Sequence, residues 1–254
     1  MGDSPVGCGP VEHTSSTPAP DALVGLVIAV DGTSGSGKSS TSRGVATRLG
    51  LRYLDTGAMF RAMTWWLLRE GVDVHDAGAV AARCGEPDIV SGTDPENPTI
   101  TVDGTDVAVE IRGDAVNGAV SPVSAVPEVR ARLLDLQRAV IARETRAGGI
   151  VVEGRDIGSV VAPDAPVKVY LSADPEARAV RRAAEQGATG ATDVAATQES
   201  LLARDRIDSG RATAPLVRAD GAVHIDTTPY SLEEVIGLVV GLVEDADARV
   251  RAAR

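Results

Sequence analysis

The amino-acid sequence predicts an α/β fold in which a parallel sheet is flanked by helices, with a small antiparallel insert and a short helical lid. Apolar runs suited to buried strands alternate with segments of helical apolar spacing, which is typical of doubly wound sheets. The first apolar run, residues 26–30, leads directly into a glycine-rich loop. Between Ile89 and Ile111 the pattern changes to short alternating runs joined at Asp103-Gly104, which indicates a hairpin.

The glycine-rich loop is the most specific local feature. Residues 32–39 read Gly-Thr-Ser-Gly-Ser-Gly-Lys-Ser, a complete G-x-x-x-x-G-K-[ST] phosphate-binding loop, or P-loop. Its backbone N–H groups are expected to surround a polyphosphate, with Lys38 at the β- and γ-phosphates and the Ser39 hydroxyl on Mg²⁺. Helical spacing at 40–49 would place the positive end of a helix dipole at the phosphates. A Gly/Ser-rich linker is the alternative interpretation, which the flanking strand and helix disfavour.

Further elements follow in order along the first half of the chain. A short strand is expected at 51–55 and a helix at 59–69, and a second helix at 77–84. The insert contributes two strands, 99–102 and 107–109, because apolar and polar residues alternate in both runs.

In the second half, Val129, Leu133 and Val140 recur at helical spacing and predict a helix at 126–144. The same reasoning predicts strands at 149–152, 167–171 and 222–225 and helices at 176–185, 198–208 and 232–242.

The chain is predicted to form one domain after a disordered tail. Residues 1–24 are rich in Pro, Ser, Thr and Gly and contain almost nothing to pack, and folding is expected to begin near Leu23. Residues 25–254 would form a P-loop domain with its core at 25–85 and 116–254. The insert would occupy 86–115 and the lid about 187–214.

Composition restricts the partners and the location. The net charge of −11 argues against a nucleic-acid surface, because such surfaces need a basic face. The cysteines, Cys8 and Cys84, share no metal or redox spacing, which favours a reducing cytoplasm. No apolar run reaches membrane-spanning length, and residues 1–24 lack the pattern of a signal peptide, so no membrane partner is expected.

Four arginines are placed by the pattern near strand ends or in loops: Arg61, Arg155, Arg204 and Arg211. Guanidinium groups bind phosphate oxygens bidentately and neutralise charge in phosphoryl transfer. A single arginine would mean little, but several in a chain with a P-loop indicate phosphoryl transfer. The candidate catalytic residues are Lys38, Arg155, Arg204 and Arg211.

Over roughly residues 26–243 the chain resembles the bacterial cytidylate kinases, a group of nucleoside monophosphate kinases. The matching segments are 31–40, 53–61, 110–112, 152–158, 163–168 and 214–216. The P-loop is shared with many unrelated NTPases. Far more specific are Asp-Thr-Gly-Ala-x-x-Arg at 55–61 and Gly-Arg-Asp-x-Gly at 154–158, in this order and with the insert between them.

The resemblance implies ATP-dependent phosphorylation of CMP and dCMP, with an insert that binds the nucleoside monophosphate (NMP) and a lid. It implies that ATP is bound by Gly32, Thr33, Ser34, Gly35, Ser36, Gly37, Lys38, Ser39 and Ser40. It implies that CMP is bound by Thr56, Arg61, Ser121, Arg130, Arg155, Asp156, Arg204, Asp208 and Arg211. No obligate protein partner is evident, and a monomer is expected.

Under this resemblance, Arg61 and Arg155 would clamp the acceptor phosphate. Ser121, Arg130 and Asp156 would read the Watson–Crick edge of cytosine, whose N4 amine needs an acceptor and whose N3 and O2 need donors. The alternative for Asp156 is an ion pair with Arg155 or another nearby arginine.

The acceptor phosphate is already an anionic nucleophile, so catalysis would consist of positioning and charge neutralisation. Mg²⁺ would bridge the ATP phosphates, held by Ser39 and mostly by water. Glu153 would orient one of those waters, and its alternative is a salt bridge to Arg155 or Lys38.

Two other functions share the P-loop. A shikimate- or gluconate-type kinase would not be expected to carry the insert or the Gly-Arg-Asp segment in this spacing. A non-catalytic nucleotide switch is disfavoured because its guanine-reading Asn/Thr-Lys-x-Asp motif is absent from the sequence, and because the arginines suit phosphoryl transfer better than signalling.

Overall fold

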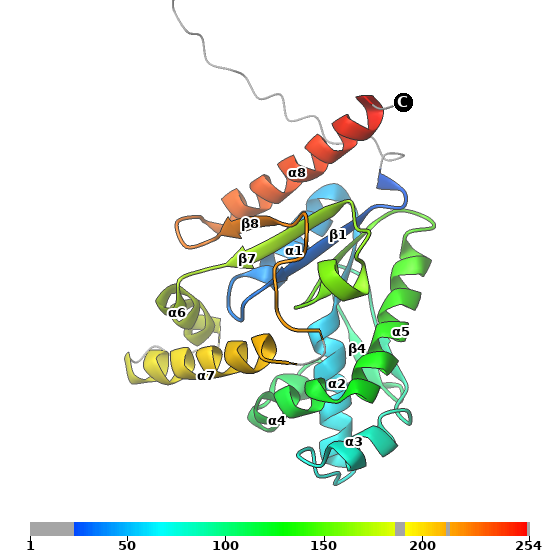
Figure 1. Cartoon of the computed structure of the whole chain (residues 1–254), viewed down its shortest axis with the longest axis vertical. Coiled ribbons are helices and arrows are strands. Elements are labelled where there is room, and N and C mark those ends of the chain that lie inside the picture. The colour runs from blue at the N-terminus through cyan, green and yellow to red at the C-terminus, as the bar shows by residue number, and fades with distance from the viewer. Residues whose placement is uncertain (1–22, 186–190, 212–213, 253–254) are drawn as a thin grey trace, which may run out of the picture.

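The computed structural model describes residues 23–185, 191–211 and 214–252 (Figure 1). Its centre is a parallel five-stranded sheet in the order β2-β6-β1-β7-β8, which confirms the predicted fold class. The strands are β1 Val27–Gly32, β2 Arg52–Asp55, β6 Ile150–Glu153, β7 Val167–Ser172 and β8 Val223–Asp226. Leu23 is buried against this sheet, so the folded part includes the end of the predicted tail; residues 1–22 lie outside the described residues.

Helices cover both faces of the sheet because its strands are apolar on both sides. Ile28 and Val30 point to the face covered by α1 (Lys38–Leu49) and α8 (Leu232–Ala252). Ala29, between them in β1, points to the opposite face. That face is covered by α2 and α5, whose bounds are Thr56–Arg69 and Pro127–Glu144.

The insert forms a second, antiparallel sheet of β3 (Ile89–Ser91), β4 (Ile100–Val102) and β5 (Thr105–Asp106). The hairpin at Asp103-Gly104 is confirmed, with Val102 opposite Thr105. The predicted strand at 107–109 is wrong. The Val107 N–H still donates to the carbonyl of Ile100, the first residue of β4, at 3.1 Å, but the Val107 carbonyl accepts from the Ile111 N–H at 3.0 Å, so the backbone turns there instead of extending. The chain then enters the short helix η2, Glu110–Arg112.

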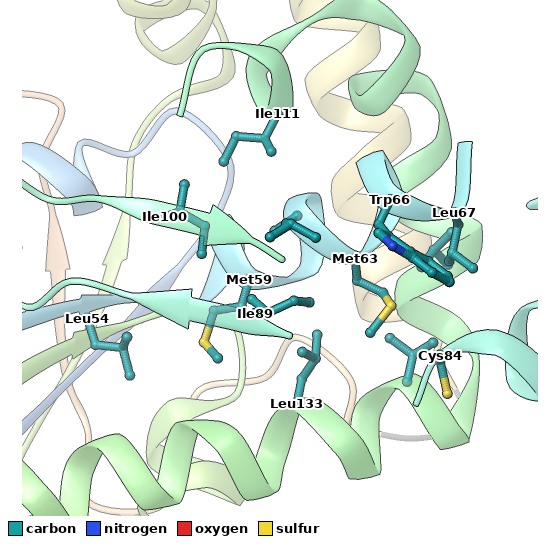
Figure 2. Close-up of a cluster of buried hydrophobic side chains, with 14 of the residues drawn as sticks. Leu54, Met59, Met63, Trp66, Leu67, Cys84, Ile89, Ile100, Ile111 and Leu133 are labelled. Atoms are coloured by element: carbon teal, nitrogen blue, oxygen red, sulfur yellow. The ribbon is translucent and has the colours of Figure 1, made fainter. Parts of the chain in front are cut away.

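The insert shares its hydrophobic core with α2 and α5 (Figure 2). Ile89 and Ile100 of the insert pack in one cluster with Met59 and Met63 of α2 and with Leu133 of α5. This shared core fixes the insert against the helix that begins directly after β2.

Two helices differ from the sequence prediction. The sequence did not indicate α4, Asp114–Ala125, because Gly118 and Pro122 in its interior disfavour a helix. Its buried side packs on α2, and this tertiary contact stabilises it. The helix predicted at 198–208 begins earlier, as α7 Ala191–Ser209, and lies beside α6, Pro175–Glu185 (Figure 1).

The remaining differences are small. The short helix α3, Ala77–Arg83, confirms the prediction at 77–84, and α8 continues ten residues beyond the predicted end at 242. Cys84 is buried with a free thiol. Within the described residues, none of the helices is both long and apolar enough to cross a membrane. The predicted lid, about 187–214, corresponds to α7 and the residues after it, with 187–190 and 212–213 outside the described residues.

Candidate active site

Parallel register brings the predicted site residues to one edge of the sheet. Val30 of β1 and Asp55 of β2 both pair with Glu153 of β6, so these three strands end at the same level. The P-loop follows β1, the start of α2 follows β2, and the segment 154–158 follows β6. Segments far apart in the sequence therefore meet at the carboxyl ends of the central strands, where open α/β sheets bind ligands.

The P-loop has the conformation that the motif predicts. Gly32 has φ of +149°, and a Cβ there would lie 1.9 Å from the Leu171 carbonyl oxygen, so only glycine fits between β1 and β7. Gly37, immediately before α1, is left-handed with φ of 87°. The Lys38 Nζ donates a hydrogen bond of 2.6 Å to the Thr33 carbonyl. Burial and the nearby charge of Arg155 lower the pKa of Lys38 to about 7, so a bound polyanion would favour its protonated form.

A pocket of about 50 Å³ lies beside the P-loop and collects most of the predicted CMP residues. It is lined by Thr56, Ser121, Arg130, Arg155, Asp156, Arg204, Asp208 and Arg211, together with Phe60 and Ser124. Of the nine predicted CMP residues, eight line this pocket, and Arg61 is the exception. We call it the acceptor pocket, after its predicted ligand.

At one end of the acceptor pocket, Arg130 and Asp156 form a buried ion pair. Arg130 also donates to the Ser124 carbonyl at 3.1 Å and lies over the Phe60 ring, 5.3 Å from its centroid. Burial raises the pKa of Asp156, and the charge of Arg130 opposes that rise. The arginine that pairs with Asp156 is therefore Arg130 rather than Arg155. At this wall of the pocket, the Asp156 carboxylate can accept hydrogen bonds and the Arg130 guanidinium can donate them.

At the other end, Arg155 connects the acceptor pocket to the P-loop. Its Nη1 donates to the Gly32 carbonyl at 2.5 Å, and its Nε donates to the Asp208 carboxylate at 2.9 Å. Asp208 also accepts from Arg211 at 2.7 Å. The pairing of Arg155 with Asp208 excludes the alternative in which Arg155 is the partner of Glu153.

Arg61 and Arg204 add positive charge that the described protein groups do not neutralise fully. The Arg61 Nη1 donates to the Asn117 side-chain oxygen at 2.5 Å. Burial and the charges of neighbouring arginines lower the pKa of Arg61 to about 10 and that of Arg204 to about 9. Among the described residues, the buried Arg204 Nε has no hydrogen-bond partner. A bound anion would neutralise these clustered guanidinium groups and accept a hydrogen bond from the unused buried donor.

The structure corrects one premise about these arginines. Arg61 lies in α2 and Arg204 in α7, not at strand ends or in loops. Arg204 nevertheless lines the pocket, and the charge of Arg155 contributes to the lowered pKa of both Arg61 and Arg204.

A second buried acid lies next to the P-loop. Glu153 is 3% exposed and accepts a hydrogen bond of 2.5 Å from the Tyr53 hydroxyl through Oε1. Within the described part of the chain its Oε2 has no hydrogen-bond partner. Burial raises the pKa of Glu153 to about 7, while Lys38 and the Ser39 hydroxyl favour its charged form.

These groups fit Mg²⁺ held largely through water. The described residues contain no group of three or more His, Cys, Asp or Glu that could hold a metal by themselves. A serine hydroxyl with one unsatisfied carboxylate oxygen nearby is suited to a hard cation that keeps most of its waters. Ser39 and Glu153 are therefore compatible with the predicted metal role.

A larger pocket, about 240 Å³, opens between the start of α1 and the insert. It is lined by Ser39, Asp55, Arg43, Arg112 and Arg182, among others. Because Ser39 borders it, this pocket is continuous with the P-loop site. Sequence reasoning assigned no role to Arg43 or Arg182, whose positions in helices gave no signal.

Sequence reasoning also assigned no role to Asp31, which precedes the P-loop. Its buried carboxylate accepts from the backbone N–H of Ile157 at 2.7 Å and of Gly158 at 2.8 Å. These bonds hold the turn that carries Asp156 against the end of β1. The only signal in the sequence was a charged residue at the end of an apolar strand.

Comparison with known proteins agrees with this geometry. The family model for cytidylate kinase matches residues 28–245. The chain belongs to the cytidylate kinase family. It is 56% identical over 224 residues to the cytidylate kinase of Streptomyces avermitilis, covering 88% of this chain and 94% of that protein. It is 46% identical over 232 residues to that of Mycobacterium leprae, covering 90% of this chain and all of the relative.

Among solved structures, a gluconokinase from Sinorhizobium meliloti aligns with a TM-score of 0.47 at 16% identity, over 91% of this chain and 98% of that one. That likeness is too distant to bear on function. The cytidylate kinase family membership confirms the resemblance seen in the sequence, and the chain is an enzyme, a nucleoside monophosphate kinase.

Proposed function

We propose that this kinase transfers the γ-phosphoryl group of ATP to CMP and dCMP by in-line displacement. One observation carries the proposal. The ion pair of Arg130 and Asp156 and three further arginines, Arg155, Arg204 and Arg211, line the same pocket, and Arg155 joins that pocket to the P-loop. Family membership supports the same reaction.

Catalysis would consist of positioning and charge neutralisation. The phosphate of CMP is itself the nucleophile, so no strong general base is needed. Arg155 lies between the proposed donor and acceptor sites, where it can contact the phosphoryl group as it is transferred. Arg204 has an unused buried donor, and Arg61 lies near it, so both are suited to the acceptor phosphate. Lys38 would neutralise charge on the ATP side.

Base selection would depend on the ion pair in the acceptor pocket. Asp156 would accept from the N4 amine of cytosine, and Arg130 and Ser121 would donate to its ring acceptors. Uracil has a carbonyl oxygen in place of the amine, so two acceptors would face each other without a proton between them. The proposed site therefore favours cytosine.

Mg²⁺ is the proposed cofactor, with the Ser39 hydroxyl as its protein ligand and Glu153 acting through water. When bound it would neutralise charge on the ATP phosphates. Glu153 would supply its unsatisfied Oε2 as the acceptor for a bound water. We place the reaction in the cytoplasm with the two nucleotides as the only partners, and propose that the chain acts as a monomer, which sedimentation analysis of the pure protein would test.

A turnover panel tests the proposal. The purified kinase is incubated with ATP, Mg²⁺ and one acceptor from CMP, dCMP, UMP, AMP and shikimate, and formation of ADP is measured. The expected result is rapid turnover with CMP and dCMP and much slower turnover with UMP and AMP. Preferred turnover of shikimate would indicate a small-molecule kinase. Slow hydrolysis that no acceptor accelerates would indicate a nucleotide switch.

A further inference from the structure

The lid helix α7 is bound to the P-loop through one partly buried carboxylate, that of Asp205. The backbone N–H of Ser34 donates to Asp205 Oδ1 at 3.0 Å. The Arg178 guanidinium of α6 donates through Nη1 to Asp205 Oδ2 at 2.5 Å and to the Ser34 carbonyl at 3.0 Å. Both backbone polar groups of one P-loop residue are therefore bound by a single ion pair, which joins α6 to α7.

Both side chains of this ion pair are largely shielded from solvent. The Arg178 and Asp205 side chains are 5% and 14% exposed. A Cβ at Gly35 would lie 3.2 Å from both the Arg178 Cβ and the Arg178 carbonyl oxygen, so α6 packs directly on the turn of the P-loop. Neither residue lines the acceptor pocket.

We propose that Asp205 is a positioning residue of the donor site, which holds the Ser34-Gly35 turn of the P-loop in the conformation that receives the ATP phosphates. The inference rests on the proposed function. Asp205 acts through the loop backbone and does not itself touch the reacting groups. Arg178 supports it by fixing the direction of its carboxylate.

Asp205 is expected to affect ATP binding because the glycine-rich turn is conformationally flexible. A glycine-rich turn has many accessible conformations, and the hydrogen bonds of Ser34 restrict them before the nucleotide binds. Without Asp205, ATP would have to order the turn itself, and the cost would appear as weaker ATP binding. The acceptor pocket is built from other contacts, so its affinity for CMP would change less.

The variant Asp205→Asn tests this inference. The amide oxygen can still accept from Ser34, but its NH₂ group would face the Arg178 donor, so the ion pair is lost. We expect the KM for ATP to rise about tenfold, the loss associated with one hydrogen bond to a charged group. The KM for CMP should change by less than about threefold on the same argument. Amide exchange of residues 33–36, measured without nucleotide, should accelerate.

The matched control is Glu199→Gln, which removes an exposed carboxylate from the same helix. We expect both KM values and the exchange rates to remain those of the unmodified kinase. Arg178→Lys is a second test variant that retains the positive charge but not the guanidinium geometry. It should shift the KM for ATP in the same direction, and it decides the question if Asp205→Asn does not fold.

The outcomes are distinguishable. Equal rises in both KM values, or a lower melting temperature with an unchanged KM for ATP, would show a purely structural role and overturn the inference. If the unmodified protein did not phosphorylate CMP, the proposed function would fail. The loop exchange rates and the direct binding of ATP would still report on Asp205 in that case.

Discussion

Arg130 and Asp156 form an ion pair in the pocket to which we assign base selection. We expect Asp156→Asn to narrow the preference for CMP over UMP, because the amide can donate to the uracil carbonyl while its contact with the cytosine amine weakens. One mispaired buried group costs roughly 1–3 kcal/mol, so kcat/KM for CMP should fall by about one to two decades. Steady-state kinetics with both acceptors measure the change.

The control for that variant is Asp164→Asn, an exposed aspartate that follows the same β6 segment. Equal loss of activity on CMP and UMP in Asp156→Asn would assign Asp156 to orienting the phosphate or to structure, and the base reader would have to be sought elsewhere.

Lys38 is the partly buried cation to which we assign charge neutralisation on the ATP side. We expect Lys38→Ala to lower kcat by about 10³-fold, the order of effect of one preorganised charge. The variant should still unfold cooperatively on heating, because burial already disfavours the protonated side chain. Wild-type turnover in Lys38→Ala would contradict the role of the P-loop lysine.

Asp31 predicts a pH dependence of stability. Burial raises its pKa in the folded protein to about 6 from an ordinary value of 3.8. Its contribution to stability is therefore fully present below about pH 4 and is lost as the pH rises through about 6. In Asp31→Asn this dependence disappears, so the stability of the variant relative to wild type should increase from pH 4 to pH 7 by on the order of 3 kcal/mol. Urea unfolding of both proteins across this range is the measurement, and a constant difference would argue against a raised pKa.

At the level of elements, the packing of α1 on α8 depends on the small size of Gly44. A Cβ there would lie 2.2 Å from the Ile236 Cδ1. We expect Gly44→Ala to destabilise the fold by roughly 1–3 kcal/mol, the usual cost of overpacking. A Cβ at Gly237 of α8 would meet no atom within 4 Å, so Gly237→Ala should instead stabilise by roughly 0.5–1 kcal/mol. Urea unfolding compares the two variants, and shifts of the same sign would be inconsistent with this packing.

The elements that the sequence predicted are those whose signals are local. Apolar runs marked the strands of the central sheet, and Asp103-Gly104 marked the hairpin. Helix α4 was not predicted because Gly118 and Pro122 have low helix propensity, while the stabilising contacts with α2 come from a distant part of the sequence. The strand expected at 107–109 does not form because the backbone turns at Val107 into η2, which the alternation of apolar and polar residues did not indicate.

At the scale of the whole molecule, the candidate site also separates residues with a local sequence signal from residues that only long-range contacts place. Motif residues such as Lys38 and Asp156 were predicted because each lies in a recognisable segment. Asp205 was not, since its contact with Ser34 joins positions 171 residues apart and depends on how α7 lies over the P-loop. The partner of Asp156 was also left open, because only the fold brings Arg130 rather than Arg155 to its carboxylate.

At the scale of the whole molecule, we expect α7 and the residues after it to close over the bound nucleotides. Guanidinium groups of α2, α7 and the segment after β6 repel one another in the protein without nucleotide, as the lowered pKa of Arg204 indicates. A bisubstrate analogue would neutralise them, so amide exchange of residues 204–211 should slow when the analogue binds. Exchange in α8, on the far face of the sheet, should remain unchanged. Equal exchange of 204–211 with and without the analogue would exclude closure.

Within five residues, α7 carries Arg204 and Asp208 in the acceptor pocket and Asp205 on the P-loop. One helix therefore belongs to both proposed binding sites, and we expect the two affinities to be thermodynamically linked. By reciprocity, the factor by which bound ATP tightens CMP must equal the factor by which bound CMP tightens ATP. We therefore expect each nucleotide to tighten the binding of the other, so that the apparent affinity for CMP rises with the concentration of ATP.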